Sequence, residues 1–470
     1  MGGHGAGGAS GGLARGRAKG GLKKAFDAEV TVEIETLVGP GALEGLDFEA
    51  IETAARRQAL AVAARAIAQR LNADHSDHVG PILSCVACHK PARYAGRREK
   101  SFETVLGEMT LARAYYHCEG CEAGFCPRDL ALGLLDTTLS PALTRMVGLV
   151  SAMVSFAEGG ELMQELAGVE VDVKQVERTA KTLGREIAED ERRVVEPSPP
   201  TAPTMYLGMD GTGVPMRRSE LAGRAGKQPD GSAKTREVKL CTVWSAECRD
   251  REGIPVRDQG SVSYSAAIES AASRDTDQTL SAFAQRVGRE ARRRGFDQAP
   301  RRVVLGDGAP WIWNLADELF PGAVQIVDLY HAKHHLSDVA KAIYGPGSDL
   351  ARQWAKQRHQ ELDEGHLGSL LLALRAHAEV NEEARKCLDY ITRNHSRMRY
   401  PEFRSKGLSV STGVVEAGCK VAIGTRLKRA GMHWTAAGAD AIIALRCCKL
   451  SGRFEDFWER RSTEARVGVR

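Results

Sequence analysis

The chain has 470 residues, of which 43% are hydrophobic and 27% charged, a composition typical of a soluble globular protein with several domains. Its 65 basic and 61 acidic residues leave a net charge of +4, which is too small to indicate a partner by itself. No stretch approaches the roughly 18 uninterrupted apolar residues that a membrane span needs, so we expect no membrane partner.

The N-terminal part is predicted to be a tail followed by helices. The first 24 residues are glycine-rich and basic and have no apolar segment like that of a signal peptide, so they are predicted to be flexible. Residues 25–80 form a predicted helical region, in which residues 48–72 are alanine-rich with helical periodicity. The 11 cysteines lack the spacing of a secreted disulfide scaffold, which favours reduced thiols and a cytoplasmic location.

Residues 81–128 contain two Cys-x-x-Cys pairs. The pairs are formed by Cys85, Cys88, Cys118 and Cys121. Thiolates in such a turn can face one ion, and two turns complete a tetrahedral zinc site. The segment between the pairs is long, but it has the pattern of strands, and a hairpin there would accommodate the length. We predict a zinc ribbon with a structural Zn²⁺, with His89 and Cys126 nearby but not bound to it.

Residues 129–196 are predicted to be helical, and part of this region has the layout of a helix-turn-helix. A helix at 156–166 and a short glycine-bearing turn precede a second helix at 172–187. The second helix of such a motif enters the DNA major groove. Its reaching side chains would be Lys174, Gln175, Arg178 and Lys181. An ordinary helical hairpin explains these residues equally well.

The segment PSPPTAP at 197–203 has four prolines in seven residues and is predicted to be a stiff linker. Beyond it, short apolar strands alternate with helices, which predicts an α/β sheet with helices on its faces over residues 204–345. Residues 346–405 are predicted to be an all-helical insertion, and residues 406–470 to complete the fold. The strands are expected at 205–209, 236–245, 261–267, 303–306 and 324–327, and the later helices near 413–423 and 436–450.

Three carboxylates stand out in this second half. Asp210 follows the apolar run MYLGM, and Asp307 follows VVLG, while Glu416 lies in a predicted helix. Each alone has a simpler explanation: a glycine-flanked turn for the aspartates, or favourable contact with a helix dipole for Glu416. Carboxylates at the ends of adjacent strands converge at one sheet edge, where they can share hard divalent cations. Together the three form the ligand set that two-metal phosphodiester chemistry requires.

Two basic runs are candidates for contact with phosphates. Six arginines cluster between residues 289 and 302, and a second group follows Glu416. Solvated helix faces are the commoner cause of such runs. The second group consists of Lys420, Arg426, Lys428 and Arg429.

Over roughly residues 80–460 the chain resembles bacterial insertion-sequence DDE transposases of the ISKra type, which are distantly related to Mutator-like elements. The resemblance implies a ribonuclease-H-like catalytic core with a helical insertion before the last acid, and it implies a triad of Asp210, Asp307 and Glu416. It also implies a role for Asp328 and His331, which match a D-x-x-H motif. The stretches that carry it are MDGTGVPMR, GKQPDGSAKTREVKL, LGDGAPWIWNLADELFPGAVQIVDLYHAKHHL, STGVVEAGCKVAIGTRLKRAGMHW and LRCCKLSGRFEDFW.

The function that the resemblance implies is metal-dependent cleavage of the ends of an insertion sequence and their transfer into target DNA. The triad would hold Mg²⁺ (or Mn²⁺), and the basic residues near Glu416 would contact DNA. Element ends and target DNA would be the partners of an enzyme acting as a homo-oligomer in the bacterial cytoplasm, associated with the nucleoid. Two alternatives are a non-catalytic sequence-specific DNA-binding protein and a ribonuclease-H-fold nuclease without strand transfer.

Overall fold

The computed structural model describes residues 44–193, 198–226, 228–272 and 279–467, together with scattered residues between 24 and 39. Residues 1–23 of the predicted tail and Pro197 of the predicted linker lie outside the described residues. The chain divides into two compact units, Met1–Thr179 with Asp456–Arg470, and Ala180–Glu455. This division falls within helix α6 (Val173–Asp190) and not at the proline-rich segment.

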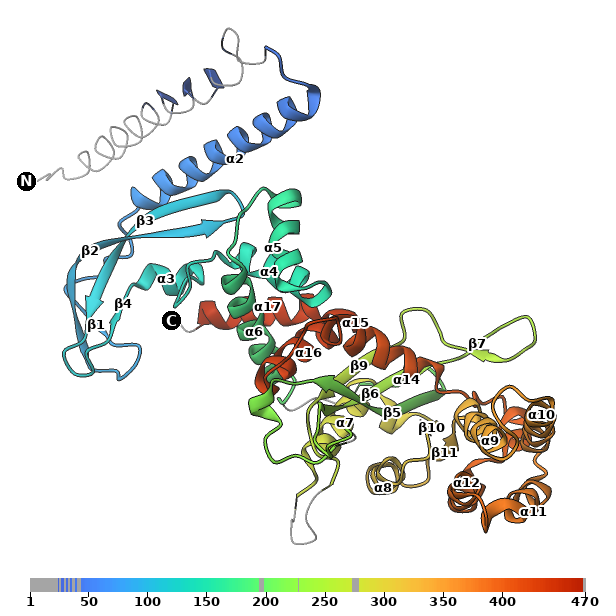
Figure 1. The fold of residues 1–470 in the computed structure, drawn as a ribbon. Coiled ribbons are helices and arrows are strands. Elements are labelled where there is room, and N and C mark those ends of the chain that lie inside the picture. Colours follow the sequence, from blue (N-terminus) through green and yellow to red (C-terminus); the bar gives the residue numbers. More distant parts are fainter. Residues whose placement is uncertain are drawn as a thin grey trace, which may run out of the picture. The chain divides into compact units, whose positions relative to one another are not determined.

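The first unit is built on a four-stranded antiparallel sheet in the order β1-β2-β3-β4 (Figure 1). Strands β2 and β3 form the long hairpin that was predicted between the Cys-x-x-Cys pairs. The predicted helices are present on both sides of it. The elements are α2 (Phe48–Asn72), β1 (Ile82–Ser84), β2 (Pro91–Thr104), β3 (Gly107–His117), β4 (Gly124–Phe125), α3 (Pro127–Leu132), α4 (Pro141–Met153), α5 (Phe156–Leu162), the π-helix η1 (Met163–Ala167) and α6, with α17 (Phe454–Val467) at the C-terminal end.

The second unit contains a five-stranded mixed sheet in the order β11-β10-β5-β6-β9. Strands β11, β10 and β5 are parallel, and β6 and β9 are antiparallel to their neighbours. Its strands and first helices are β5 (Thr204–Pro215), η2 (Arg218–Glu220), β6 (Thr235–Ser245), β9 (Ser263–Ala267), α7 (Ala282–Arg293), η3 (Phe296–Gln298), β10 (Arg301–Gly306), α8 (Pro310–Leu319), β11 (Val324–Val327) and α9 (Leu329–Tyr344), with a small hairpin of β7 (Cys248–Arg249) and β8 (Pro255–Val256).

Helices cover both faces of this sheet. Helices α7 and α8 lie on one face and α14 and α16 on the other, and the insertion helices gather beyond β10 and β11 (Figure 1). The apolar runs of the central strands are buried in one continuous core, as the sequence pattern predicts. The remaining elements are α10 (Asp349–Asp363), α11 (Leu367–Ala378), α12 (Glu382–Asn394), η4 (His395–Arg397), α13 (Tyr400–Ser405), α14 (Gly413–Gly418), the π-helix η5 (Cys419–Gly424), α15 (Thr425–Leu427) and α16 (Ala436–Leu450).

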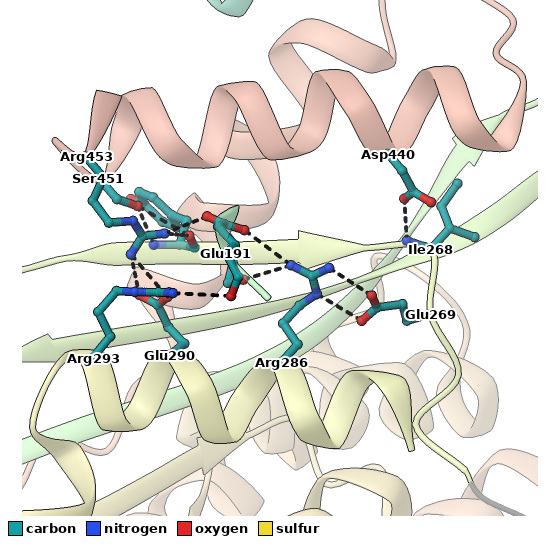
Figure 2. Close-up of polar contacts among 11 residues, drawn as sticks. Glu191, Ile268, Glu269, Arg286, Glu290, Arg293, Asp440, Ser451 and Arg453 are labelled. Carbon is teal, nitrogen blue, oxygen red and sulfur yellow. Dashed lines mark hydrogen bonds and ion pairs between the residues drawn. The ribbon is translucent and has the colours of Figure 1, made fainter. Parts of the chain in front are cut away.

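A buried network of ion pairs joins helix α7 to the end of helix α16 in the second unit (Figure 2). Arg453 lies 2.8 Å from Glu290, whose side chain is fully buried, and 3.2 Å from Glu191. Arg286, on the same helix as Glu290, lies 3.5 Å from Glu191 and 2.8 Å from Glu269. Although Glu290 is buried, which raises the pKa of a carboxyl, the positive charges of Arg453 and Arg293 hold its pKa down at about 2.

We expect replacement of Arg453 by Met to lower the free energy of unfolding of the second unit by about 3–5 kcal/mol, because Glu290 keeps its charge with Arg293 as its remaining partner and Glu191 loses its pair with Arg453. The matched control is Lys406→Met, which breaks an exposed pair with Glu402 at 2.7 Å and should cost less than about 1 kcal/mol. Because the pKa of Glu290 is depressed, its contribution is present above pH 4.5, the ordinary value, and is lost as the pH falls toward 2. Urea unfolding followed by tryptophan fluorescence measures both effects, and equal losses in the two variants would contradict the prediction.

Candidate functional site

The three predicted carboxylates line one cavity in the second unit, at the edge of the mixed sheet. The cavity has a volume of about 400 Å³. Its lining also contains Asp328 and His331, so all five residues predicted for catalysis meet here although they come from four separate stretches of the chain. The lining residues are Met209, Asp210, Asp307, Asp328, Tyr330, His331, His334, Thr412, Val415 and Glu416.

Asp210 lies within strand β5, which continues to Pro215, and not at the end of a strand as predicted. Its Oδ1 accepts a hydrogen bond from the Gly211 amide at 2.6 Å, and its Oδ2 accepts one from the Cys419 thiol at 3.3 Å. Burial raises the pKa of Asp210, and the negative charge of Asp307 raises it further. Cys419 is buried, and its contact with Asp210 could not be read from cysteine spacing.

Asp307 directly follows strand β10, as predicted. Its Oδ1 accepts a hydrogen bond from the Ala309 amide at 2.9 Å, and its backbone carbonyl accepts one from the Tyr390 hydroxyl at 2.8 Å. The next residue, Gly308, has φ +100°, and a Cβ there would lie 2.4 Å from Tyr390 Cε2. The glycine is therefore required by both backbone conformation and space. Helix α12 of the insertion, through Tyr390, holds the loop that carries Asp307.

Glu416 lies in helix α14, which approaches strand β5 closely at Gly208. A Cβ on Gly208 would lie 2.1 Å from Val415 Cγ2, so only glycine allows this packing. The Glu416 side chain is 67% exposed and forms a 2.8 Å ion pair with Lys420, one turn further along. Among the described residues, the three carboxylates do not bring their oxygens within 4.8 Å of one another as a group. The cavity thus assembles the carboxylates around a shared space but not in direct contact.

Asp328 and His331 have different surroundings. The buried Asp328 carboxylate caps helix α9 by accepting the His331 amide at 2.6 Å. Its other oxygen accepts hydrogen bonds from both the amide and the hydroxyl of Thr412, the latter at 2.7 Å. Thr412 immediately precedes helix α14, so Asp328 fixes where the helix of Glu416 begins. The His331 ring lies on the cavity side, with its Nε2 3.2 Å from that of His335.

The residues predicted to contact DNA are not all at the surface. Lys420, Lys428 and Arg429 are exposed, and the ammonium group of Lys428 contacts the Thr212 hydroxyl, two residues beyond Asp210. Arg426, however, is fully buried beneath Trp434, with its guanidinium 5.4 Å from the ring centre. The prediction that Arg426 contacts DNA is therefore wrong.

Two further predicted contact regions can be compared with the structure. Lys174 and Arg178 are exposed on helix α6, which follows η1 after a short turn, so the helix, turn and helix lie where they were predicted. The side-chain amide of Gln175 donates a hydrogen bond to the Thr138 hydroxyl at 2.8 Å. Arginines of the cluster at 289–302 contact other groups of the protein itself. Arg293 pairs with Glu290, and Arg301 donates a hydrogen bond to the Thr204 hydroxyl.

The four cysteines of the two Cys-x-x-Cys pairs form a compact cluster in the first unit. All four sulfurs lie within 4.8 Å of one another, and the pairs Cys85–Cys121 and Cys88–Cys118 are each separated by 3.6 Å. The first pair lies in the turn between β1 and β2, and the second lies in the turn between β3 and β4. Backbone amides of Cys88 and Ala87 directed at the Cys85 sulfur lower its pKa to about 7.

This arrangement fits a structural zinc ion, because four thiols on two turns provide a tetrahedral set of soft ligands. His89 and Cys126 are not part of the cluster, in agreement with the prediction. Cys126 is buried outside the cluster, and burial raises the pKa of its thiol. The zinc site is therefore predicted by the sequence and consistent with the structure.

Comparisons with known proteins add little to this geometry. No family model matches the chain, and no curated protein matches it. Among solved structures, the chain is similar to one described as the Drosophila P element transposase strand transfer complex, at 12% sequence identity and a TM-score of 0.23, over 71% of this chain and 84% of that one. A similarity this low does not identify residues or an activity. Within the described residues, no helix is long and apolar enough to cross a membrane.

Proposed function

We propose that the protein is a DDE transposase that cleaves the ends of an insertion sequence and joins them to target DNA. The observation that carries the proposal is the shared cavity, which brings together Asp210, Asp307 and Glu416 from a strand, a strand end and a helix. Asp328 and His331 line the same cavity, which is the placement that the resemblance to ISKra-type transposases implies. A purely structural role would not explain why acids from three elements converge on a space open to solvent.

The architecture of the second unit supports the same proposal. We infer that its mixed sheet is a ribonuclease-H-like core, because the helical insertion α10–α13 interrupts the fold before the element with the last acid, as that resemblance implies. Helix α12 of the insertion also contacts the loop of Asp307. A nuclease of the same fold would need no such insertion beside its site.

The carboxylate cavity fits hard divalent cations. Oxygen ligands from three acids suit Mg²⁺ or Mn²⁺, and the raised pKa of Asp210 reflects negative charge confined in a buried place, which a cation would offset. Asp210, Asp307 and Glu416 would hold two such ions, which when bound supply activation of the attacking oxygen and neutralisation of charge at the attacked phosphate. Glu416 would give up its exposed pair with Lys420, which contributes at most about 1 kcal/mol.

The protein's own side chains would then have distinct tasks. His331, on the cavity side of helix α9, is placed to donate to a phosphate oxygen or to an attacking hydroxyl group. Asp328 is a positioning residue, because both of its oxygens are already engaged by the amide of His331 and by Thr412. Lys420, released from Glu416, and Lys428 would contact the DNA backbone beside the site.

The first unit would recognise the ends of the element. The zinc-binding turns and the exposed Lys174 and Arg178 of helix α6 are the surfaces that we propose for this contact. Pairing of two DNA ends would require at least a dimer. We also propose that the protein acts in the bacterial cytoplasm, at the nucleoid.

The test is a cleavage and strand-transfer assay on a plasmid that carries the gene with its flanking DNA. With Mg²⁺ the full-length protein should cut at two positions flanking the gene and join the resulting 3′ ends to a second plasmid, whereas omission of Mg²⁺ and Mn²⁺ should abolish both reactions. Cutting without joining would favour a nuclease. Specific binding without cutting, in either Mg²⁺ or Mn²⁺, would favour a non-catalytic DNA-binding protein.

Tyr390 offers a more specific prediction. Tyr390→Phe removes the hydroxyl that donates to the Asp307 carbonyl and keeps the ring that packs on Gly308, so we expect roughly fivefold slower cleavage, equivalent to about 1 kcal/mol. The loss should fall on the rate at saturating DNA and leave DNA affinity unchanged. Tyr344→Phe, at the end of helix α9 just before the insertion, is the control and should cleave at the wild-type rate. A Tyr390→Phe enzyme as fast as wild type would show that the insertion does not position Asp307.

A further inference from the structure

Strands β5 and β6 extend beyond the carboxylate cavity as a two-stranded ribbon. The ribbon is paired in register from Asp210 with Leu240 to Pro215 with Thr235. At its end the chain makes a hairpin whose described residues are 216–226 and 228–234, and it contains part of the stretch GKQPDGSAKTREVKL, to which neither the triad nor the zinc site gives a role. The hairpin is held by hydrogen bonds of the Gly226 amide to the Gly231 carbonyl at 2.8 Å and of the Ala233 amide to the Arg224 carbonyl at 3.1 Å.

This hairpin encloses a second cavity of about 850 Å³. Its charged lining consists of Arg218, Arg224, Lys234 and Asp230, so its net charge is +2 when His433, which also lines it, is neutral. All three cations are exposed, and within the described part of the chain no acidic side chain forms an ion pair with any of them. Asp230 contributes the one negative charge in that sum, and its Oδ1 accepts hydrogen bonds from the amide and hydroxyl of Ser232 at 2.9 and 2.7 Å.

The segment 428–434 connects this basic cavity with the carboxylate site. At one end Lys428 contacts Thr212, close to Asp210. At the other end Trp434 forms a β-bridge with Met216, and its carbonyl accepts the Arg217 amide at 2.8 Å. The ribbon therefore has Lys428 near the carboxylates and Arg218, Arg224 and Lys234 at its far end.

The length of the ribbon can be compared with the spacing of phosphates in a DNA strand. The six residues from Asp210 to Pro215 span about 17–20 Å at roughly 3.3 Å per residue. Phosphates repeat about every 3.4 Å along the axis for one strand, so a ribbon that lies along the duplex axis would span roughly five phosphates. Two exposed arginines and a lysine without an acidic partner among the described residues suit phosphate contacts.

We infer that the hairpin cavity lined by Arg218, Arg224 and Lys234 binds the DNA backbone about five phosphates from the position that reacts at the carboxylates. The inference rests on the proposed function, since it names the path of the substrate of that same site. The hairpin positions DNA and does not take part in the chemistry. It therefore acts on affinity, and the contact does not depend on base sequence.

The test is the salt dependence of binding to a fluorescent 30-base-pair DNA duplex, measured by anisotropy without added Mg²⁺ or Mn²⁺ so that no cleavage occurs and the zinc of the first unit is kept. The triple variant Arg218→Gln, Arg224→Gln, Lys234→Gln should bind more weakly and should reduce the slope of log Kd against log salt by roughly 2 to 3, since each phosphate contact contributes about 0.9. The control variant Lys356→Gln, Arg375→Gln, Arg385→Gln removes the same charge from exposed positions on the insertion helices and should keep the slope.

Several outcomes would overturn the inference. Equal slopes for wild type and the triple variant, or equal reductions in the triple variant and the control, would show that the cavity makes no specific contact. Tighter binding of an RNA duplex or of polyglutamate than of DNA would assign the cavity to another partner. Arg224→Glu alone should weaken binding at least tenfold, which keeps the test independent of any fold defect in the triple variant. Because binding is read without added Mg²⁺ or Mn²⁺, a failure of cleavage would refute the proposed function and leave this measurement interpretable.

Discussion

Asp307→Asn is expected to reduce DNA cleavage by at least about a thousandfold, because the amide cannot replace a carboxylate that holds a divalent cation and that interaction is worth several kcal/mol in the transition state. Asp210→Asn should have an effect of the same size. The measurement is the initial rate of cleavage of the plasmid that carries the gene and its flanks, at saturating Mg²⁺. Glu318→Gln, an exposed acid on helix α8, is the control and should cleave normally.

The stability of Asp210→Asn shows whether a loss of activity comes from misfolding. Burial raises the pKa of Asp210 above its value in the unfolded chain. The ionised carboxylate therefore lowers the stability of the folded protein at neutral pH, and this cost disappears when the group is protonated at acid pH. Removing the charge should leave the metal-free protein as stable as wild type or up to about 1 kcal/mol more stable at pH 7. An inactive protein with unchanged or higher stability is the signature of a functional carboxylate. A variant that is fully active would remove that residue from the triad.

The parts of the site that the sequence predicts are those with a local signal. Asp307 ends an apolar strand before a helix that starts with a proline, and Glu416 lies in a helix, so pattern alone places both. The prediction for Asp210 stopped the strand too early, because Gly211 and Gly213 disfavour strands. In the structure, pairing with β6 carries strand β5 through both glycines.

The parts that could not be predicted depend on contacts between distant residues. Tyr390 lies 83 residues from Asp307 in sequence, and no periodicity connects a helix of the insertion with a strand end. Arg426 belongs to a basic run whose other members are exposed, and only the packing of Trp434 onto it shows that it is buried. Cys419 looks like any small core residue until strand β5 is placed beside it. Charge and spacing identify the kinds of chemistry available, whereas tertiary packing decides which side chains reach it.

Removal of zinc should unfold the sheet of the first unit and leave the second unit folded. The strands β1 and β4 are only three and two residues long, and their ends are held by the turns that carry the four cysteines. The core beneath them is small and includes Cys85 and Cys118 themselves, so the metal is expected to replace apolar packing as the main source of stability. Structural zinc in small domains contributes about 10–16 kcal/mol, more than such a core can supply.

The measurement separates the two units through their tryptophans. Of the six tryptophans, five lie between residues 180 and 455, and Trp458 alone belongs to the first unit. Cys118→Ser should lower the zinc content well below one per chain and expose the hairpin at 91–117 to protease, with the tryptophan fluorescence nearly unchanged. Cys126→Ser replaces a buried cysteine outside the cluster and should retain zinc. A Cys118→Ser protein that has lost its zinc and still resists protease as wild type does would show that the sheet does not depend on the metal.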